Sequence, residues 1–332
     1  MRESSNVMRF VFIGLAAMAF IAGFLYKEGA LGKKPRARRD IPHIKIDSYI
    51  KPIDPAKIGY RELPHFELEL KNASAMAVGK KGNIYIGGES GFALLDSSGK
   101  HMLLTDLSRP VKSIAVSPGG TIFIGDTDRV RVLDKNGRES SSWEPFSDVA
   151  FITSIAATDE YLFAADARNR VIWRYTHDGT VSGTIGKKDK AAGIKGFFIP
   201  GPFFDIATAY EEELWAVNPG RHALENYTLD GRLQTSWSKS SIDIDGFCGC
   251  CNPTHFALMP DGAFITAEKG IPRVKIHEPS GALRTVVAGS NLFVEGTLIA
   301  DVALDARQRV LVLDPTMNAV RIFVKKEKEA GN

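Results

Sequence analysis

The segment Ile155-Ala-Ala-Thr-Asp-Glu-Tyr-Leu-Phe-Ala-Ala-Asp166 contains two short β-rich runs on either side of a polar turn. Apolar runs of this length, bounded by turn residues, are typical of β-strands. An apolar-Ala-apolar start like that around Ala156 occurs six times, at spacings between 38 and 51 residues. The central alanines of these starts are Ala77, Ala115, Ala156, Ala207, Ala257 and Ala303. The chain is therefore built from one repeated β unit.

Each copy continues with a second and a third β-rich run. The third run of the first five copies ends in a turn whose glycine follows Ser, Asn or Asp, at Gly99, Gly137, Gly179, Gly231 and Gly281. Such a glycine supplies the positive φ angle that tight hairpins require. Six copies of roughly 40–50 residues with four short strands each predict an all-β fold, a six-bladed β-propeller.

The sixth copy ends after its third strand, at residues 319–324, and a β-rich segment at residues 65–70 precedes the first copy. We expect this early segment to be the fourth strand of the last blade. It would then close the ring and cover sheet edges that otherwise invite aggregation.

The repeat unit resembles the NHL repeat over residues 65–325. The best matches are Asp166-Ala-Arg-Asn-Arg-Val171 and Asp314-Pro-Thr-Met-Asn-Ala-Val320, whereas Glu89 and residues 267–273 depart from the pattern. Similar six-bladed folds include gluconolactonase-like hydrolases, strictosidine-synthase-like proteins and peptidyl-hydroxyglycine lyases. The resemblance implies the propeller fold without choosing among these activities.

A charge-free run of 17 residues, 10–26, lies between Arg9 and Lys27. As a helix it would reach roughly 25 Å, which spans a membrane if the flanking basic side chains extend to the headgroups. A cleaved signal peptide is the alternative, but no small-x-small cleavage site follows the run. The expected divisions are a tail (1–9), a transmembrane anchor (10–26), a basic flank and linker (27–60), the propeller (61–326) and a second tail (327–332).

The basic charge is confined to the N-terminal end. The chain carries a net charge of +3, and residues 1–39 alone carry +6, which leaves −3 for residues 40–332. A slightly acidic propeller argues against a nucleic-acid partner. The basic residues after the anchor favour a cytoplasmic propeller, but that rule is weak for long domains. We expect a membrane-anchored protein with an extracytoplasmic, periplasmic propeller.

Two repeats are longer than the others, and their extra length lies between blades. Residues 193–205 contain four Phe, and residues 243–255 contain every cysteine of the chain. Cys248, Cys250, Cys251 and His255 lie within eight residues. Thiolates and imidazole are the ligands preferred by zinc, copper(I) and iron–sulfur centres, so these four residues are candidate metal ligands. A redox dithiol between Cys248 and Cys251, and a structural cross-link, are the two other interpretations.

His255 occupies the first position of an inner strand, which Asp205 and Asp301 occupy in the neighbouring copies. We expect all three to face the mouth of the central channel. The loops around that mouth add further candidate ligand-binding residues, Arg221, His222, Glu268, Lys269 and Arg273. Arginine suits a bidentate contact with carboxylate or phosphate. The alternative is that these side chains are ordinary solvated residues of the repeat.

The sequence lacks a phosphate-binding glycine loop, a nucleophile elbow and a His-Glu-x-x-His motif. The favoured hypothesis is a membrane-tethered propeller that binds a protein partner or small ligand on one face. Its Cys/His cluster would bind a metal or act as a redox dithiol in a membrane redox or maturation system. The alternatives are a metal-dependent hydrolase or lyase at the channel mouth, and a pure protein-interaction scaffold.

Overall fold

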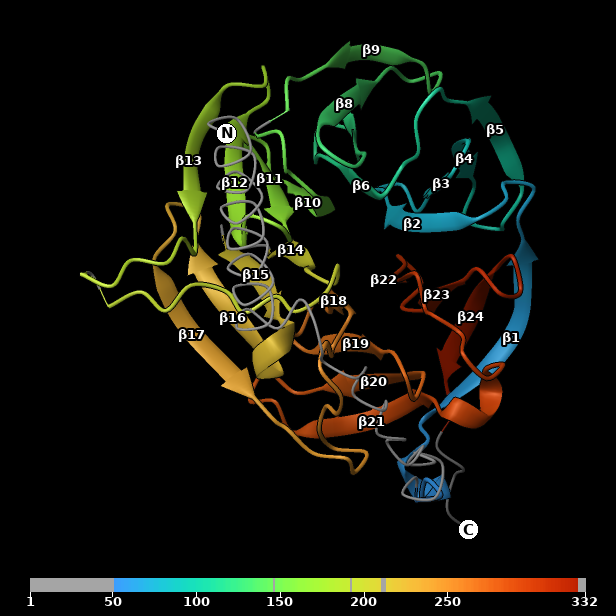
Figure 1. Cartoon of the computed structure of the whole chain (residues 1–332). Coiled ribbons are helices and arrows are strands. Elements are labelled where there is room, and N and C mark those ends of the chain that lie inside the picture. Colours follow the sequence, from blue (N-terminus) through green and yellow to red (C-terminus); the bar gives the residue numbers. More distant parts are fainter. Residues whose placement is uncertain (1–50, 146, 192, 210–212, 328–332) are drawn as a thin grey trace, which may run out of the picture. The chain divides into compact units, whose positions relative to one another are not determined.

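A computed structural model describes residues 51–327, except residues 146, 192 and 210–212. Their strands form six four-stranded antiparallel sheets, which are arranged as the blades of a ring (Figure 1). The predicted anchor at residues 10–26 lies outside the described residues. No helix long and apolar enough to cross a membrane occurs in the part of the chain that the structure describes.

The first three blades follow the chain from the inner to the outer strand. Blade 1 contains β2 (Ala73–Val78), β3 (Ile84–Gly88), β4 (Gly91–Leu95) and β5 (His101–Asp106). Blade 2 contains β6 (Ser113–Val116), β7 (Ile122–Gly125), β8 (Val130–Leu133) and β9 (Glu139–Ser142). Blade 3 contains β10 (Ile152–Ala157), β11 (Tyr161–Asp166), β12 (Val171–Thr176) and β13 (Val181–Ile185).

Two more blades follow the same order, and the last one takes its outer strand from the start of the domain. Blade 4 contains β14 (Ile206–Ala209), β15 (Glu213–Asn218), β16 (Ala223–Thr228) and β17 (Leu233–Ser238). Blade 5 contains β18 (His255–Leu258), β19 (Phe264–Glu268), β20 (Arg273–His277) and β21 (Leu283–Ala288). Blade 6 contains β22 (Asp301–Leu304), β23 (Val310–Asp314), β24 (Ala319–Lys325) and β1 (Tyr60–Glu67). The described residues also form three short 3₁₀ helices, η2 (Pro55–Lys57), η3 (Pro219–Arg221) and η4 (Ser290–Leu292).

The hairpin glycines have the positive φ angles that their sequence context predicts. Each of the five turn glycines has a positive φ, between 73° at Gly137 and 97° at Gly231. Residues with a Cβ rarely adopt this conformation, so the repeated glycine fixes where the third strand turns into the fourth.

The apolar core is divided among the blade junctions. The described residues form six buried apolar clusters, and each cluster joins two neighbouring blades. Inner strands of adjacent blades also touch all around the ring, including β22 with β2. A blade therefore buries its two faces against its neighbours, which is why the repeats stabilise one another only in a closed ring.

The ring closes as predicted, with β1 completing blade 6. β1 pairs antiparallel with β24, from Tyr60 opposite Lys325 to Glu67 opposite Ala319. The strand lies earlier in the chain than the predicted segment 65–70, because it continues through Pro64 at a register shift between Leu63 and Phe66. Proline lacks an N–H donor and is tolerated only at a bulge or edge, and β1 is the outer strand of its blade.

A buried arginine joins the two ends of the ring. Arg321 on β24 donates to both carboxylate oxygens of Glu62 on β1, at 2.7 and 2.8 Å. Its third contact is Asp314 at the end of β23, at 3.3 Å. On the inner side of the same closure, the Met76 N–H of blade 1 donates to the Asp301 carboxylate of blade 6 at 2.8 Å.

Replacing this arginine tests the closure. We expect Arg321→Leu to lower the free energy of unfolding by about 3–5 kcal/mol, because the buried Asp314 carboxylate loses its cation. Glu62→Gln should cost clearly less, since Arg321 keeps Asp314 and Glu62 is the more exposed partner. Urea denaturation of both variants measures the difference, and equal losses would contradict this account of the ring closure.

Candidate functional site

The two long connections lie on one face of the ring. In each antiparallel blade the connection from the outer strand to the next blade is on the same side as the loop between the second and third strands. This face therefore carries residues 186–205, between β13 and β14, and residues 239–254, between β17 and β18. We call residues 246–254 the cysteine loop.

The long connections also meet each other and η3. The Gly220 N–H donates to the Phe198 carbonyl at 3.0 Å, and the Phe198 N–H donates to Asn218 Oδ1 at 2.9 Å. A Cβ built on Gly201 would lie 3.1 Å from the sulfur of Cys251. The Phe-rich connection therefore packs directly against the cysteine loop, and a larger residue at Gly201 would press on that thiol.

The start of the cysteine loop packs against side chains of blades 4 and 5. Phe247 is fully buried and its ring stacks on Trp237, with ring centroids 5.9 Å apart. Its other ring neighbour is His277, at 5.2 Å. The Lys275 ammonium donates to the Gly246 carbonyl at 2.7 Å and lies 4.6 Å from the centre of the Phe247 ring. The loop is thus positioned by a buried cation and an aromatic stack.

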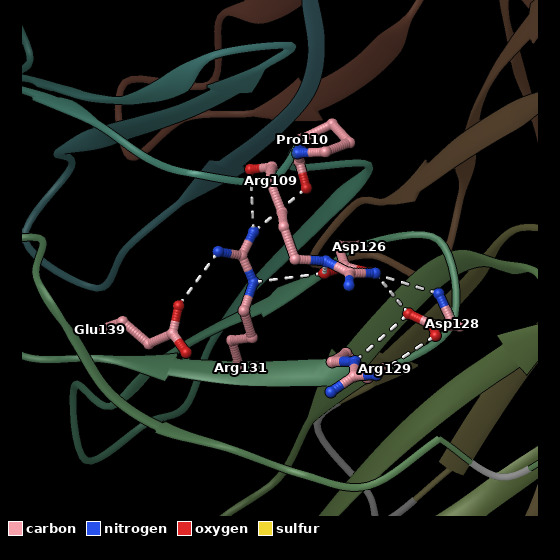
Figure 2. Close-up of polar contacts among 7 residues, drawn as sticks. All are labelled: Arg109, Pro110, Asp126, Asp128, Arg129, Arg131 and Glu139. Carbon is pink, nitrogen blue, oxygen red and sulfur yellow. Dashed lines mark hydrogen bonds and ion pairs between the residues drawn. The ribbon is translucent and has the colours of Figure 1, made fainter.

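A polar pair recurs on this face in most blades, where the second strand ends opposite a residue of the third strand. In blade 2 the Asp126 carboxylate contacts Arg131 at 3.5 Å and Arg109 at 2.6 Å, and Arg131 also reaches Glu139 at 3.2 Å (Figure 2). Figure 2 also shows Arg109 and Arg129 converging on Asp128. The network contains three arginines and three carboxylates, so its formal charges cancel.

Blade 5 carries a different version of the same pair. The fully buried Glu268 receives two bonds from Arg273, at 2.6 and 3.1 Å, and one from Lys275, at 2.8 Å. One carboxylate therefore faces two buried cations, and burial lowers the pKa of Lys275. Arg273 also places a guanidinium nitrogen 3.8 Å from the sulfur of Cys248. The cysteine loop consequently lies over a site with excess positive charge.

The three cysteines are free thiols with different exposure. Cys250 is exposed, Cys248 is half-buried and Cys251 is buried. The sulfurs of Cys250 and Cys251 lie 3.3 Å apart. Asn252 fixes the loop around them, since its amide donates to the Cys248 and Lys269 carbonyls at 2.6 and 3.1 Å. The structure therefore brings two thiols together, one accessible and one shielded.

Burial keeps the inner thiols protonated at neutral pH. It raises the pKa of Cys251 to about 11, and the hydrogen bond with Cys250 acts in the same direction. Burial also raises the pKa of Cys248, although Arg273 opposes the shift. A metal ion at these sulfurs would have to displace their protons.

His255 lies next to Asp205 at the inner strands. Its Nδ1 is 3.8 Å from Asp205 Oδ2, which also accepts the Phe256 N–H at 2.9 Å. The other Asp205 oxygen accepts the Ser154 hydroxyl of blade 3 at 2.6 Å. Asp205 therefore links three consecutive blades, and Asp301 links blades 6 and 1. Both predicted channel residues have a structural role, and their proposed ligand binding stays a prediction.

Burial shifts the acid–base behaviour of this inner group. It raises the pKa of Asp205, with the His255 charge opposing the shift. It lowers the pKa of His255, with Asp205 opposing. The pKa of Asp301 lies well above its ordinary range, because of burial first and the Asp205 charge second. Both carboxyls therefore hold their protons to higher pH than exposed aspartates do.

The predicted metal set is not assembled here. Among the described residues, no group of three or more His, Cys, Asp or Glu side chains is placed to hold a metal ion. Of the four predicted ligands, Cys250 and Cys251 contact each other, whereas Cys248 lies beside Arg273 and His255 lies beside Asp205. Adjacent positions along the chain do not ensure a shared site, because His255 begins β18 while the cysteines lie in the preceding loop.

The predicted anion-binding side chains are largely occupied. Arg221 lies 3.6 Å from Glu225, and His222 Nδ1 is 2.7 Å from the Ser240 hydroxyl. Lys269 lies 5.0 Å from the centre of the Phe203 ring. Arg273 and Glu268 bind each other, so the arginine is not free to hold an anion in this conformation.

Sequence reasoning missed Phe247 and Lys275, whose contacts anchor the start of the cysteine loop on the blades. A signal for the lysine exists, because Lys275 interrupts the β-rich run Val274-Lys-Ile276 at a position where an apolar residue would be ordinary. A charged residue there is expected only with a buried partner, and Glu268 is that partner.

Comparison with solved structures supports the fold. A structure titled streptogramin B lyase is similar over 82% of this chain and 100% of that one, with 13% identity and a TM-score of 0.58. Virginiamycin B lyase from Staphylococcus aureus is 12% identical, with a TM-score of 0.55. The similarity covers 80% of this chain and 99% of that one. A protein of unknown function from Bacteroides thetaiotaomicron is 14% identical, with a TM-score of 0.57. The similarity covers 82% of this chain and 74% of that one.

These likenesses establish the six-bladed propeller and leave the activity open, because identities this low carry the fold alone. No protein-family model matches the chain, and no curated protein matches it. The NHL assignment therefore stays a prediction.

The buried histidine under the cysteine loop gives a pH test. Burial, with nearby Lys275 as the second cause, lowers the pKa of His277 to about 3 from an ordinary 6.5. Below pH 6.5 His277 is protonated in the unfolded chain but remains neutral in the folded protein. This histidine therefore reduces the free energy of unfolding as the pH falls from 6.5, by about 2–3 kcal/mol at pH 4.5.

We expect His277→Phe to remove that part of the acid sensitivity. Urea denaturation of both proteins at pH 7.5, 6.5, 5.5 and 4.5 measures it. The stability difference between wild type and variant should change steadily below pH 6.5, and a difference that is constant with pH would contradict a neutral buried His277.

Proposed function

We propose that the protein is a binding propeller whose cysteine loop exchanges disulfides with a protein partner. The observation that carries this proposal is the 3.3 Å contact between the sulfurs of Cys250 and Cys251. The exposed Cys250 is the thiol that a partner can reach, and Cys251 behind it is the resolving thiol. Such an arrangement of one accessible and one resolving thiol suits thiol–disulfide exchange.

The exchange has two steps. The Cys250 thiolate attacks a partner disulfide, forms a mixed disulfide and releases one partner thiolate, which takes a proton. Cys251 then loses its proton, attacks the Cys250 sulfur and releases the second partner thiol. The partner gains two electrons and two protons, and the propeller keeps a Cys250–Cys251 disulfide.

That disulfide would be easy to reduce again. Adjacent Cα atoms are about 3.8 Å apart, which is below the usual 4.4–6.8 Å range for disulfides. Strained, accessible disulfides have the more oxidising potentials. The loop would therefore serve as a reversible site in a membrane redox or maturation system rather than as a permanent cross-link.

A soft metal ion is the second candidate for the same thiols. The observation in its favour is that the sulfurs of Cys250 and Cys251 lie 3.3 Å apart, with Cys248 in the same loop. Thiolates select copper(I) and zinc, but a structural zinc site needs four ligands. The hydrolase or lyase alternative would rest on the similar folds alone.

The proposal also includes an N-terminal membrane anchor. Residues 10–26 would hold the protein in a membrane, with the propeller on the extracytoplasmic, periplasmic side, where disulfides persist. The basic residues of the flank would then lie close to anionic headgroups.

Oxidised glutathione is a suitable probe for the thiol pair. We expect intact mass spectrometry of the treated wild type to show the loss of two hydrogens. Cys251→Ser should instead accumulate one glutathione adduct on Cys250, because no resolving thiol remains. Cys250→Ser should form several-fold less adduct, since the two other thiols are less exposed.

Cys248→Ser is the matched control and should still close the Cys250–Cys251 disulfide. An adduct that forms mainly on Cys248 would overturn the assigned roles. One equivalent of zinc or copper in anaerobically purified protein, lost in Cys250→Ser, would favour the metal candidate instead.

The anchor is tested by a paired substitution. We expect the wild type to stay with membranes after an alkaline carbonate wash. Leu15→Lys with Ile21→Lys should release it, because each lysine costs about 2.5–3.5 kcal/mol in a spanning helix. A reporter active only outside the cytoplasm, fused after Asn332, should be active. A wild type that washes off, or an inactive reporter, would contradict the anchor or its orientation.

A further inference from the structure

A groove of about 1040 Å³ runs between blades 3 and 4, and no cysteine lines it. One wall is the connection that follows β13, which extends outward from the ring at the left of Figure 1. The volume lies at the upper end of ordinary ligand sites, which are about 300–1,000 Å³. We call this cavity the lysine groove.

The floor of the lysine groove is one face of the β16–β17 pair. The residues that form it are cross-strand neighbours, namely Ala223 with Ser238, Glu225 with Ser236 and Tyr227 with Leu233. From residue 223 to residue 227 the strand rises about 14 Å at roughly 3.4 Å per residue. The floor therefore matches the length of four or five extended residues.

The walls are strongly basic. The charged residues that line the groove are Lys187, Lys188, Lys190, Lys195, Arg221, Arg232, Asp189 and Glu225. Six basic and two acidic side chains give a formal charge of +4, although residues 40–332 together carry −3. A local field opposite in sign to that of the surrounding domain attracts and orients an anionic ligand.

The acidic residue of the floor is already satisfied. Glu225 accepts from Asn218 at 2.8 Å and from the Tyr227 hydroxyl at 2.7 Å, with Arg221 at 3.6 Å. It therefore does little to neutralise the lysines of the opposite wall. The groove also has an apolar component, since Ile194 and Leu233 are both lining residues and both about half exposed.

The lysine wall has a defined shape. Asp189 and Ile194 exchange two backbone hydrogen bonds, at 3.0 and 2.7 Å, and form the neck of a hairpin. Gly186 and Gly196 on either side both have positive φ, and a Cβ on Gly196 would lie 2.9 Å from that of Lys188. Glycines at these positions allow the hairpin to leave β13 and to present its lysines beside the floor.

We propose that the lysine groove binds an extended acidic segment of a partner protein, with carboxylates toward the lysines and apolar side chains toward Ile194 and Leu233. The length of the floor, the charge of the walls and the two apolar positions all fit such a peptide. The proposal is independent of the thiol chemistry, because none of the cysteines lines this groove.

The test uses the full chain in a neutral detergent and a fluorescent ten-residue peptide of alternating Glu and Leu. We expect saturable binding by fluorescence polarisation, and at least tenfold weaker binding when Gln replaces every Glu of the peptide. Changing Lys187, Lys188, Lys190 and Lys195 together to Gln should weaken binding tenfold or more. Raising the salt from 50 to 500 mM should act in the same direction.

Two controls separate the groove from general charge attraction. The same change at the exposed Lys80, Lys81, Lys325 and Lys326 removes equal charge elsewhere and should alter affinity less than twofold. Ser236→Trp should block the floor and abolish binding, whereas Thr235→Trp, on the opposite face of β17, should not.

Equal losses from both lysine sets, or unchanged binding in Ser236→Trp, would overturn the site. If polyphosphate or a short RNA binds through the groove lysines tenfold more tightly than the acidic peptide, the assignment of an acidic peptide is wrong.

Discussion

The antiparallel pairing of β1 with β24 is the constraint on which the rest of the structure depends. Each apolar cluster of the described residues lies between two blades, so the cluster joining blades 6 and 1 exists only if the ring is closed. The bidentate contact of Arg321 with Glu62 strengthens that closure, and the bond from Met76 to Asp301 secures its inner side.

The residue at the end of the second strand pairs with a residue of the third strand in several blades, and this pair differs in charge from blade to blade. Asp126 faces Arg131 in blade 2, Asp314 faces Arg321 in blade 6, and blade 5 places Glu268 against Lys275. The additional Arg273 of blade 5 gives that junction a net positive charge, whereas the blade 2 network is neutral and Arg321 of blade 6 faces two carboxylates. The cysteine loop lies next to this junction, where Arg273 contacts the sulfur of Cys248.

The sequence predicts the blades well because their signal is periodic. Each inner strand contains the expected alanine, and the turn glycines adopt the conformation that their neighbours indicate. The outer strand of blade 6 is harder to place, because Pro64 interrupts the β pattern and a bulge absorbs it. The pairing of Glu268 with Arg273 follows from strand register and could not be read from composition.

The predicted metal site shows where prediction from the sequence fails. Cys250, Cys251 and His255 are close along the chain, but the start of β18 directs the histidine to Asp205 while the loop keeps the thiols together. Proximity in sequence is a good guide within a strand and a poor one across a strand boundary. The lysine groove could not be foreseen at all, because its floor and its wall come from different blades.

The geometry of the closure also has a mechanical consequence. Tyr60 and Lys325 are opposite each other, so both chain ends leave the same end of the β1–β24 ladder. A force that pulls the two ends apart would load the hydrogen bonds one after another, as in opening a zipper, rather than all together in shear. A propeller tethered through one end is protected from this, because the load passes to the ring through a single strand while the other end stays slack.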